Sequence, residues 1–230
     1  MLDIFIKGEL VDLAIPTEDF AAGEIWYKWF NNKSINKYLE QGIHPNTKDS
    51  QVHFFKSMGA DRLVLVIQNK EGKPLGVTSL SFINFQKRSC DFALVVDSMA
   101  DMKLIGFASL EASALIVKHG FDELGVTRIN AVQHADLFKW QQRLELLGFR
   151  LEGYHKNKFV KGSLVADSVS IAVLYSDFIK ICSYRDGKLW DSLDKMKKRI
   201  DNLPKESARK QFENKFTNEI KAYYQKIFGL

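Results

Sequence analysis

The chain has 230 residues, of which 46% are hydrophobic and 27% charged, a composition typical of a globular protein. It has no apolar run of the roughly 20 residues that a membrane-spanning helix needs, and its start lacks the pattern of a signal peptide. The net charge of +5 is carried by residues 179–230, with 13 Lys and Arg against 7 Asp and Glu, whereas residues 1–178 have 20 against 21. We therefore expect neither a membrane nor a nucleic acid partner.

Hydrophobic patterning predicts alternating helices and strands along most of the chain. In chain order they are a strand or hairpin at 2–15, helices at 18–30, 35–40 and after Thr47, strands at 62–67, 74–85 and 90–96, a helix at 106–124, a strand at 128–133, a helix at 137–147, and a hairpin of strands at 149–160 and 164–174. The short turns between the three consecutive strands predict an antiparallel meander.

The character of the sequence changes beyond Tyr175. Two apolar stripes at helical spacing follow, separated by Pro204, which ends a helix. We therefore divide the chain into a main domain at 1–178 and a basic two-helix extension at 179–230.

The two cysteines, Cys90 and Cys182, are too few and too far apart for a disulfide framework or a zinc site. We expect no metal, and the cysteine usage favours a reducing, cytoplasmic location.

A stretch between a predicted strand and the long predicted helix is suited to phosphate. It consists of Lys103, Leu104, Ile105, Gly106, Phe107 and Ala108. A loop with free backbone N–H groups that leads into a helix N-terminus attracts anions. Gly106 lets a ligand approach the backbone without a Cβ in the way, and Lys103 adds a positive charge.

Four pieces of the chain, in order, resemble one family. They are Pro74-Leu-Gly-Val-Thr-Ser, Ser89-Cys-Asp-Phe-Ala-Leu-Val-Val, the stretch 103–108, and Leu147-Gly-Phe followed by Glu152-Gly. Together they are similar to the Gcn5-related N-acetyltransferase (GNAT) superfamily, over residues 8–174. The resemblance implies an α/β (α+β) fold, a mixed and mostly antiparallel sheet flanked by helices, with acetyl-CoA as cosubstrate.

The resemblance also implies where the cosubstrate lies. The CoA pyrophosphate is expected on residues 103–108, and the pantetheine amides are expected to pair with the backbone of Leu94, Val95 and Val96 as an added strand. The chain departs from the family at Leu144, where a Tyr often protonates the leaving thiolate. Either another group protonates the thiolate here or it leaves unprotonated.

Acetyl transfer to an amine needs a group that accepts the amine proton. Asp91 lies where many relatives carry Glu on the same strand, and His134 ends the strand after the long helix and carries an imidazole, a side chain suited to proton transfer. The alternatives are a strand-edge carboxylate in solvent for Asp91 and a loop histidine bonded to backbone for His134.

Two classes of acceptor compete. The segments 29–37 and 74–88 look similar to acetyltransferases that modify nucleotide-linked 4-amino sugars for surface glycans, including pseudaminic acid. Rim-type relatives instead acetylate a protein N-terminus or ribosomal protein. A third interpretation is a CoA-binding module without catalysis.

The interpretation favours the amino sugar. A nucleotide sugar needs aromatic platforms and cations, so the predicted substrate contacts are Trp29, Lys87, Arg88, Tyr154 and His155. The same interpretation allows a homodimer.

Overall fold

The computed structural model describes residues 2–97, 102–215 and 219–229, and the side chains of residues 102–104 lie outside this description. The described strands form one sheet, β1 (Ile4–Lys7), β2 (Val11–Ala14), β3 (Leu63–Asn69), β4 (Pro74–Asn84), β5 (Ser89–Val96), β6 (Arg128–His134), β7 (Arg150–Lys161) and β8 (Leu164–Leu174). The helices are α1 (Glu18–Ala22), α2 (Trp26–Asn31), α3 (Lys48–Lys56), α4 (Met102–Asp122), α5 (Phe138–Glu145), α6 (Tyr175–Ser183), α7 (Leu193–Asp201), α8 (Ala208–Lys215) and α9 (Lys221–Phe228), with short 3-10 turns η1 (Asn36–Tyr38) and η2 (Ala135–Leu137).

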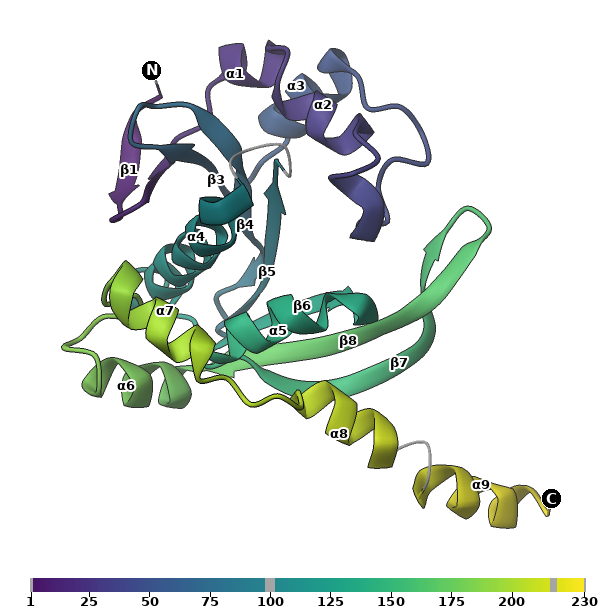
Figure 1. Cartoon of the computed structure of the whole chain (residues 1–230). Helices are drawn as coiled ribbons and strands as arrows, with labels where there is room; N and C mark the ends of the chain where they lie inside the picture. The colour runs from purple at the N-terminus through teal and green to yellow at the C-terminus, as the bar shows by residue number, and fades with distance from the viewer. Residues whose placement is uncertain (1, 98–101, 216–218, 230) are drawn as a thin grey trace.

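The sheet is mixed and mostly antiparallel, with the strand order β1-β2-β3-β4-β5-β6-β8-β7 (Figure 1). Only the central pair, β5 and β6, is parallel among the pairs of the described sheet. Parallel neighbours need a crossover, and α4 provides it. The fold class, the meander and the final hairpin predicted from the sequence are confirmed.

Each face of the sheet has its own apolar core, because β-strand side chains alternate between faces. On β3, Leu65 and Ile67 join the larger core that includes residues of α4 and α5. Val64 and Val66 join a smaller core with Trp26 and the other side chains of α1 to α3. Strands buried on both faces explain the near-continuous apolar run at 63–67.

Two helix boundaries differ from the predictions. The helix expected at 18–30 is two helices, because α1 ends at Ala22 with Gly23 as its C-cap, and α2 begins at Trp26. The long helix begins by Met102, so the stretch 103–108 is helical and is not the loop that the sequence predicted. Met, Lys and Leu favour helix, and one glycine at position 106 is not enough to stop it.

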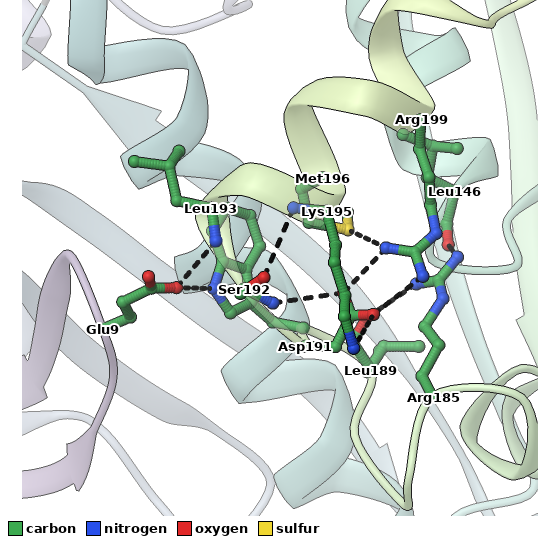
Figure 2. A network of polar contacts seen from close by, with 11 residues as sticks. Glu9, Leu146, Arg185, Leu189, Asp191, Ser192, Leu193, Lys195, Met196 and Arg199 are labelled. Atoms are coloured by element: carbon green, nitrogen blue, oxygen red, sulfur yellow. Dashed lines mark hydrogen bonds and ion pairs between the residues drawn. The ribbon is translucent and has the colours of Figure 1, made fainter.

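The segment after α6 packs into the main core. Met196 and Leu189 are fully buried with the residues of the sheet and α4. Glu9, in the β1–β2 turn, accepts hydrogen bonds of 2.8 Å from the backbone N–H of Leu193 and from Trp190 Nε1, and Asp191 pairs with Arg199 at 2.7 Å (Figure 2). The predicted extension is therefore attached to the sheet as far as α7, while α9 buries no residue and projects away from the sheet (Figure 1).

The described helices include none that is both long enough and apolar enough to cross a bilayer. Both cysteines are buried free thiols, and burial raises the pKa of Cys90 to about 12.

A buried carboxylate anchors the first hairpin to the crossover helix. Glu111 of α4 is fully buried, and its oxygens accept from the backbone N–H groups of Glu9, Leu10 and Val11. These groups close the turn between β1 and β2, so one side chain fixes the edge of the sheet against α4.

Replacing Glu111 with Gln tests this anchor. Gln keeps one acceptor oxygen and gains an NH₂ donor, which leaves buried backbone N–H groups without a partner. We expect the free energy of unfolding to fall by about 1–3 kcal/mol, measured by urea denaturation. Glu123→Gln is the control at an exposed position near the end of α4, and an equal loss in both variants would contradict the anchor.

The same variant predicts a pH dependence. Burial raises the pKa of Glu111 above its usual 4.5, against the three N–H donors that lower it. A raised folded pKa means that the contribution of the group to stability is complete below the unfolded pKa and is lost as pH rises through the folded pKa. The stability difference between wild type and Glu111→Gln should therefore shrink as pH rises above about 4.5; a constant difference would contradict the assignment.

Candidate functional site

The two central strands part after a short paired stretch. β5 and β6 are paired at Ser89–Arg128, Cys90–Ile129 and Asp91–Asn130, and no further pair follows along the described strands. Beyond that point β5 stays on β4 and β6 stays on β8. The result is a V-shaped opening between the ends of β5 and β6.

The alternation of antiparallel pairing determines which backbone groups face this opening. The N–H of Asp97 donates to the carbonyl of Leu75 on β4 at 2.7 Å. In an antiparallel pair, residues two positions apart direct their backbone groups to the same side. Val95 and Ala93 therefore also direct their N–H and C=O groups to β4, and the residues between them direct theirs away from it. The N–H and C=O groups of Leu94 and Val96 therefore face the opening, whereas the backbone of Val95 faces Val77 of β4.

The start of α4 lies beside these strands. Ile105 and Phe107 pack against the same core as the side chains of Leu94 and Val96. The first N–H groups of a helix have no partner within it and carry a partial positive charge. The predicted phosphate-binding stretch is thus placed next to the opening as the first turns of a helix.

A cavity of about 780 Å³ lies on the opposite face of β4 and β5. Its floor is formed by the side chains that alternate onto this face, and its walls by α2, α3 and the segment 39–46. The lining includes Trp26, Phe30, Phe54, Phe82, Glu40, His44, Arg62, Ser79, Ser81, Asp91, Ala93, Leu94 and Val95. The volume falls within the range typical of small-molecule sites.

The wall segment 39–46 is fixed at both ends. Asn31 and Asn46 exchange two hydrogen bonds of 2.7 Å between side chain and backbone. At the other end, Lys161 from the tip of the β7–β8 hairpin donates to the backbone and side chain of Asn36. Gly42 has φ +88°, and a Cβ there would collide with Asn36, so only glycine fits the turn.

Asp91 lies where the opening and the cavity meet. It forms the last pair before β5 and β6 part, and its side chain lines the cavity. Its carboxylate accepts a 3.1 Å hydrogen bond from Asn130 Nδ2, and Asn130 Oδ1 in turn accepts from Arg128 Nε at 2.6 Å. This relay orients the carboxylate and leaves it exposed to the cavity.

His134 has a different environment. The ring is 7% exposed and packs between Tyr38 and Phe159, with ring centroids 5.0 and 4.6 Å away. Its Nδ1 accepts the backbone N–H of Asp136 at 3.1 Å, so the ring caps η2. His134 does not line the cavity, and this geometry matches the alternative of a histidine bonded to backbone.

The predicted substrate contacts are not part of the cavity lining. Trp29 is buried in the smaller core, and the turn that carries Lys87 and Arg88 is bonded to the end of α4 through Arg88 Nε and the carbonyl of Gly125. On the hairpin, Tyr154 donates to Asp167 at 2.7 Å and His155 bonds to Ser170 at 3.0 Å. None of these five side chains lines the cavity.

The sequence interpretation missed a pair of residues at the rim of the cavity. Phe82 is 66% exposed and has φ +53°, in an irregular part of the β4–β5 pairing. The guanidinium of Arg62 lies 5.2 Å from the ring of Phe54 and 5.8 Å from the ring of Phe82. A strained backbone and a bulge beside a cavity are common at binding sites. No residue pattern in the sequence marks this conformation.

The described residues contain no group of three or more His, Cys, Asp or Glu side chains that could hold a metal ion. The polar groups near the opening and the cavity include the backbone of Leu94 and Val96, the oriented carboxylate of Asp91 and the guanidinium of Arg62.

Comparisons with known proteins identify the fold. No protein-family model matches the sequence, and a search of curated proteins finds no match. Among solved structures, the chain is similar to spermidine N-acetyltransferase from Vibrio cholerae in complex with CoA and spermine, with 18% identity, a TM-score of 0.64, and coverage of 74% of this chain and 98% of that one. An acetyltransferase of the GNAT family from Bacillus anthracis has 23% identity, a TM-score of 0.60 and the same coverage.

A third similar structure is the microcin C7 self-immunity acetyltransferase MccE in complex with acetyl-CoA and AMP. It has 20% identity, a TM-score of 0.60, and covers 73% of this chain and 93% of that one. The chain thus has the fold of the GNAT acetyltransferases, which confirms the fold that the sequence resemblance implied. The Rim-type and amino-sugar resemblances stay predictions.

Replacing Phe82 with Asn tests whether the backbone at the rim of the cavity is strained. A left-handed conformation costs most residues about 1–2 kcal/mol and is tolerated by Asn, while the lost contact with Arg62 is worth about 0.5–1 kcal/mol. We expect Phe82→Asn to unfold at the same or a higher temperature than wild type, measured by calorimetry. Phe85→Asn, at an exposed aromatic without positive φ, is the control; a clear loss of stability confined to Phe82→Asn would contradict the strain.

Proposed function

We propose that this chain transfers the acetyl group of acetyl-CoA directly to a primary amine. The observation that carries the proposal is the parting of β5 and β6 beside the start of α4, with a cavity on the other face of the same strands. The GNAT fold adds support, since similar structures were solved with CoA or acetyl-CoA.

The pantetheine arm enters the opening as an added strand. Its amides pair with the backbone groups of Leu94 and Val96, and the thioester then lies near Leu94, at the boundary between the opening and the cavity. The backbone N–H of Leu94 stabilises the negative charge that develops on the thioester oxygen.

The amine approaches from the cavity. Its nitrogen attacks the thioester carbon, the C–S bond breaks, and the amine proton passes to the carboxylate of Asp91 directly or through a water molecule. Asn130 holds that carboxylate in place. Leu144, at the position of the family's proton donor, is buried and carries no proton to give, so the CoA sulfur leaves as a thiolate, which a thiol pKa of about 8.5 tolerates.

The acceptor that we propose is an amino group of a nucleotide-linked amino sugar. The features that favour it are the size of the cavity, its aromatic wall and the guanidinium of Arg62 at the rim, because sugar rings stack on aromatic faces and phosphates bind Arg. The predicted cations Lys87 and Arg88 do not contribute to this cavity.

An acceptor screen tests both the proposed acetyl transfer and the proposed acceptor. Purified protein is mixed with acetyl-CoA and with UDP-linked 4-amino sugars, spermidine or peptides with a free N-terminus, and release of free CoA thiol is measured. Turnover with the sugars alone supports the full proposal. Turnover with peptides or spermidine alone overturns the sugar, and binding of CoA without turnover of any amine favours the non-catalytic module.

Asp91→Asn tests the proton acceptor. The amide keeps the shape but cannot take a proton, so we expect kcat to fall about 10²- to 10⁴-fold with unchanged affinity for acetyl-CoA. Asp136→Asn, at a carboxylate within η2, is the control. We expect His134→Ala to act through stability; unchanged turnover in Asp91→Asn with every acceptor would show that the base is wrongly assigned.

A further inference from the structure

The space above Gly106 on α4 is occupied by a guanidinium. A Cβ built on Gly106 would lie less than 3.0 Å from Nη1 of Arg143, a separation that real Cβ atoms essentially never show, and 3.4 Å from its Cζ. Arg143 belongs to α5, so the two helices approach each other through this glycine and this arginine. Glycine at position 106 is what lets the guanidinium lie against the first turns of α4.

Arg143 has no partner for its charge among the described residues. Its side chain makes no hydrogen bond, ion pair or cation–π contact there, although the residue is partly buried. Other arginines of the chain are paired, such as Arg128 with Glu152, Arg150 with Asp177 and Arg199 with Asp191. A guanidinium without a side-chain partner among the described residues can donate paired hydrogen bonds to an anion that enters the space beside it.

The neighbours of Arg143 and Gly106 pack in the same core as the strand residues at the opening. Ile105, next to Gly106, packs in the core that contains Leu94 and Val96, the residues whose backbone faces the opening. Trp140 and Leu144, one turn before and one residue after Arg143, belong to the same core. The guanidinium therefore lies between α4 and α5, beside residues that share a core with the part of β5 that faces the opening.

We propose that Arg143 binds the phosphates of the acyl donor. The inference rests on the proposed function, because it takes acetyl-CoA as that donor. The planar guanidinium donates paired hydrogen bonds that match two phosphate oxygens, which a lysine cannot do. Position 103 carries Lys where the family's motif has Arg, and Arg143 supplies the forked cation from the neighbouring helix.

Binding measurements with three donors test the role. Acetyl-CoA carries the pyrophosphate and the 3′-phosphate, its 3′-dephospho form carries the pyrophosphate alone, and S-acetylpantetheine carries neither. Dissociation constants are measured by calorimetry for wild type, Arg143→Gln and Arg143→Lys. Lys180→Gln, which removes one positive charge from the exposed face of α6, is the matched control.

We expect Arg143→Gln to weaken acetyl-CoA about 10- to 100-fold, the loss of a charge-assisted pair of hydrogen bonds. Arg143→Lys should restore only part of the affinity, S-acetylpantetheine should bind all variants equally, and Lys180→Gln should match wild type. If Arg143→Gln loses as much affinity for the 3′-dephospho donor as for acetyl-CoA, Arg143 binds the pyrophosphate. If it loses affinity for acetyl-CoA alone, Arg143 binds the 3′-phosphate.

Two results would overturn this inference and leave the proposed function standing. One is equal affinity of wild type and Arg143→Gln for acetyl-CoA. The other is a loss of affinity for S-acetylpantetheine as large as that for acetyl-CoA, which would indicate a structural role of Arg143. Absence of acetyl-CoA binding by the wild type overturns the proposed function itself, and this inference with it.

Gly106→Ala provides a second, independent variant. Alanine favours helix over glycine, and the group displaced by its Cβ is the end of a flexible side chain, so the fold should tolerate it without a lower melting temperature. Because the guanidinium is pushed away, acetyl-CoA should bind more weakly while S-acetylpantetheine does not. Unchanged affinity for acetyl-CoA in a folded Gly106→Ala would contradict the placement.

Discussion

The site depends on a sheet that keeps two strands apart without leaving either of them loose. β5 and β6 share only three residue pairs, yet β4 and β8 hold their other edges along nearly the whole of each strand. The unpaired backbone of Leu94 and Val96 is therefore a fixed feature of a well-supported sheet and not a frayed end. Backbone groups in such a position need a partner, and an extended arm with amides is a partner of matching geometry.

The alternation of one strand separates the two substrates of the proposed reaction. On β5, residues 91, 93 and 95 turn their side chains to the cavity and their backbone to β4. Residues 92, 94 and 96 turn their backbone to the opening and their side chains to the core. A donor thus approaches along the edge and an acceptor from the face, and the two meet at the residues where edge and face adjoin, beside Asp91.

Local chemistry made much of the fold predictable. The three-strand meander follows from strongly apolar runs joined by short turns, and the helix after Thr47 follows from its side chain, which accepts the N–H of Ser50 at 3.1 Å. Features that depend on tertiary packing were not predictable. Trp26 and Trp29 lie on one short helix, and which of them faces the cavity is decided by how α2 lies on the sheet. The wall at 39–46 has no periodicity, because its shape comes from Asn31, Asn46 and Gly42.

Gly106 has one role in the sequence motif and another in the folded structure. From the sequence, the missing Cβ is clearance for a ligand in a loop. In the fold, position 106 is inside a helix, where the backbone N–H is already used, so direct donation to phosphate is not its role. The clearance instead admits the side chain of Arg143, 37 positions further on. The phosphate binding that we propose for the stretch then depends on a contact between helices, and only the packing of α4 against α5 brings Arg143 to this position.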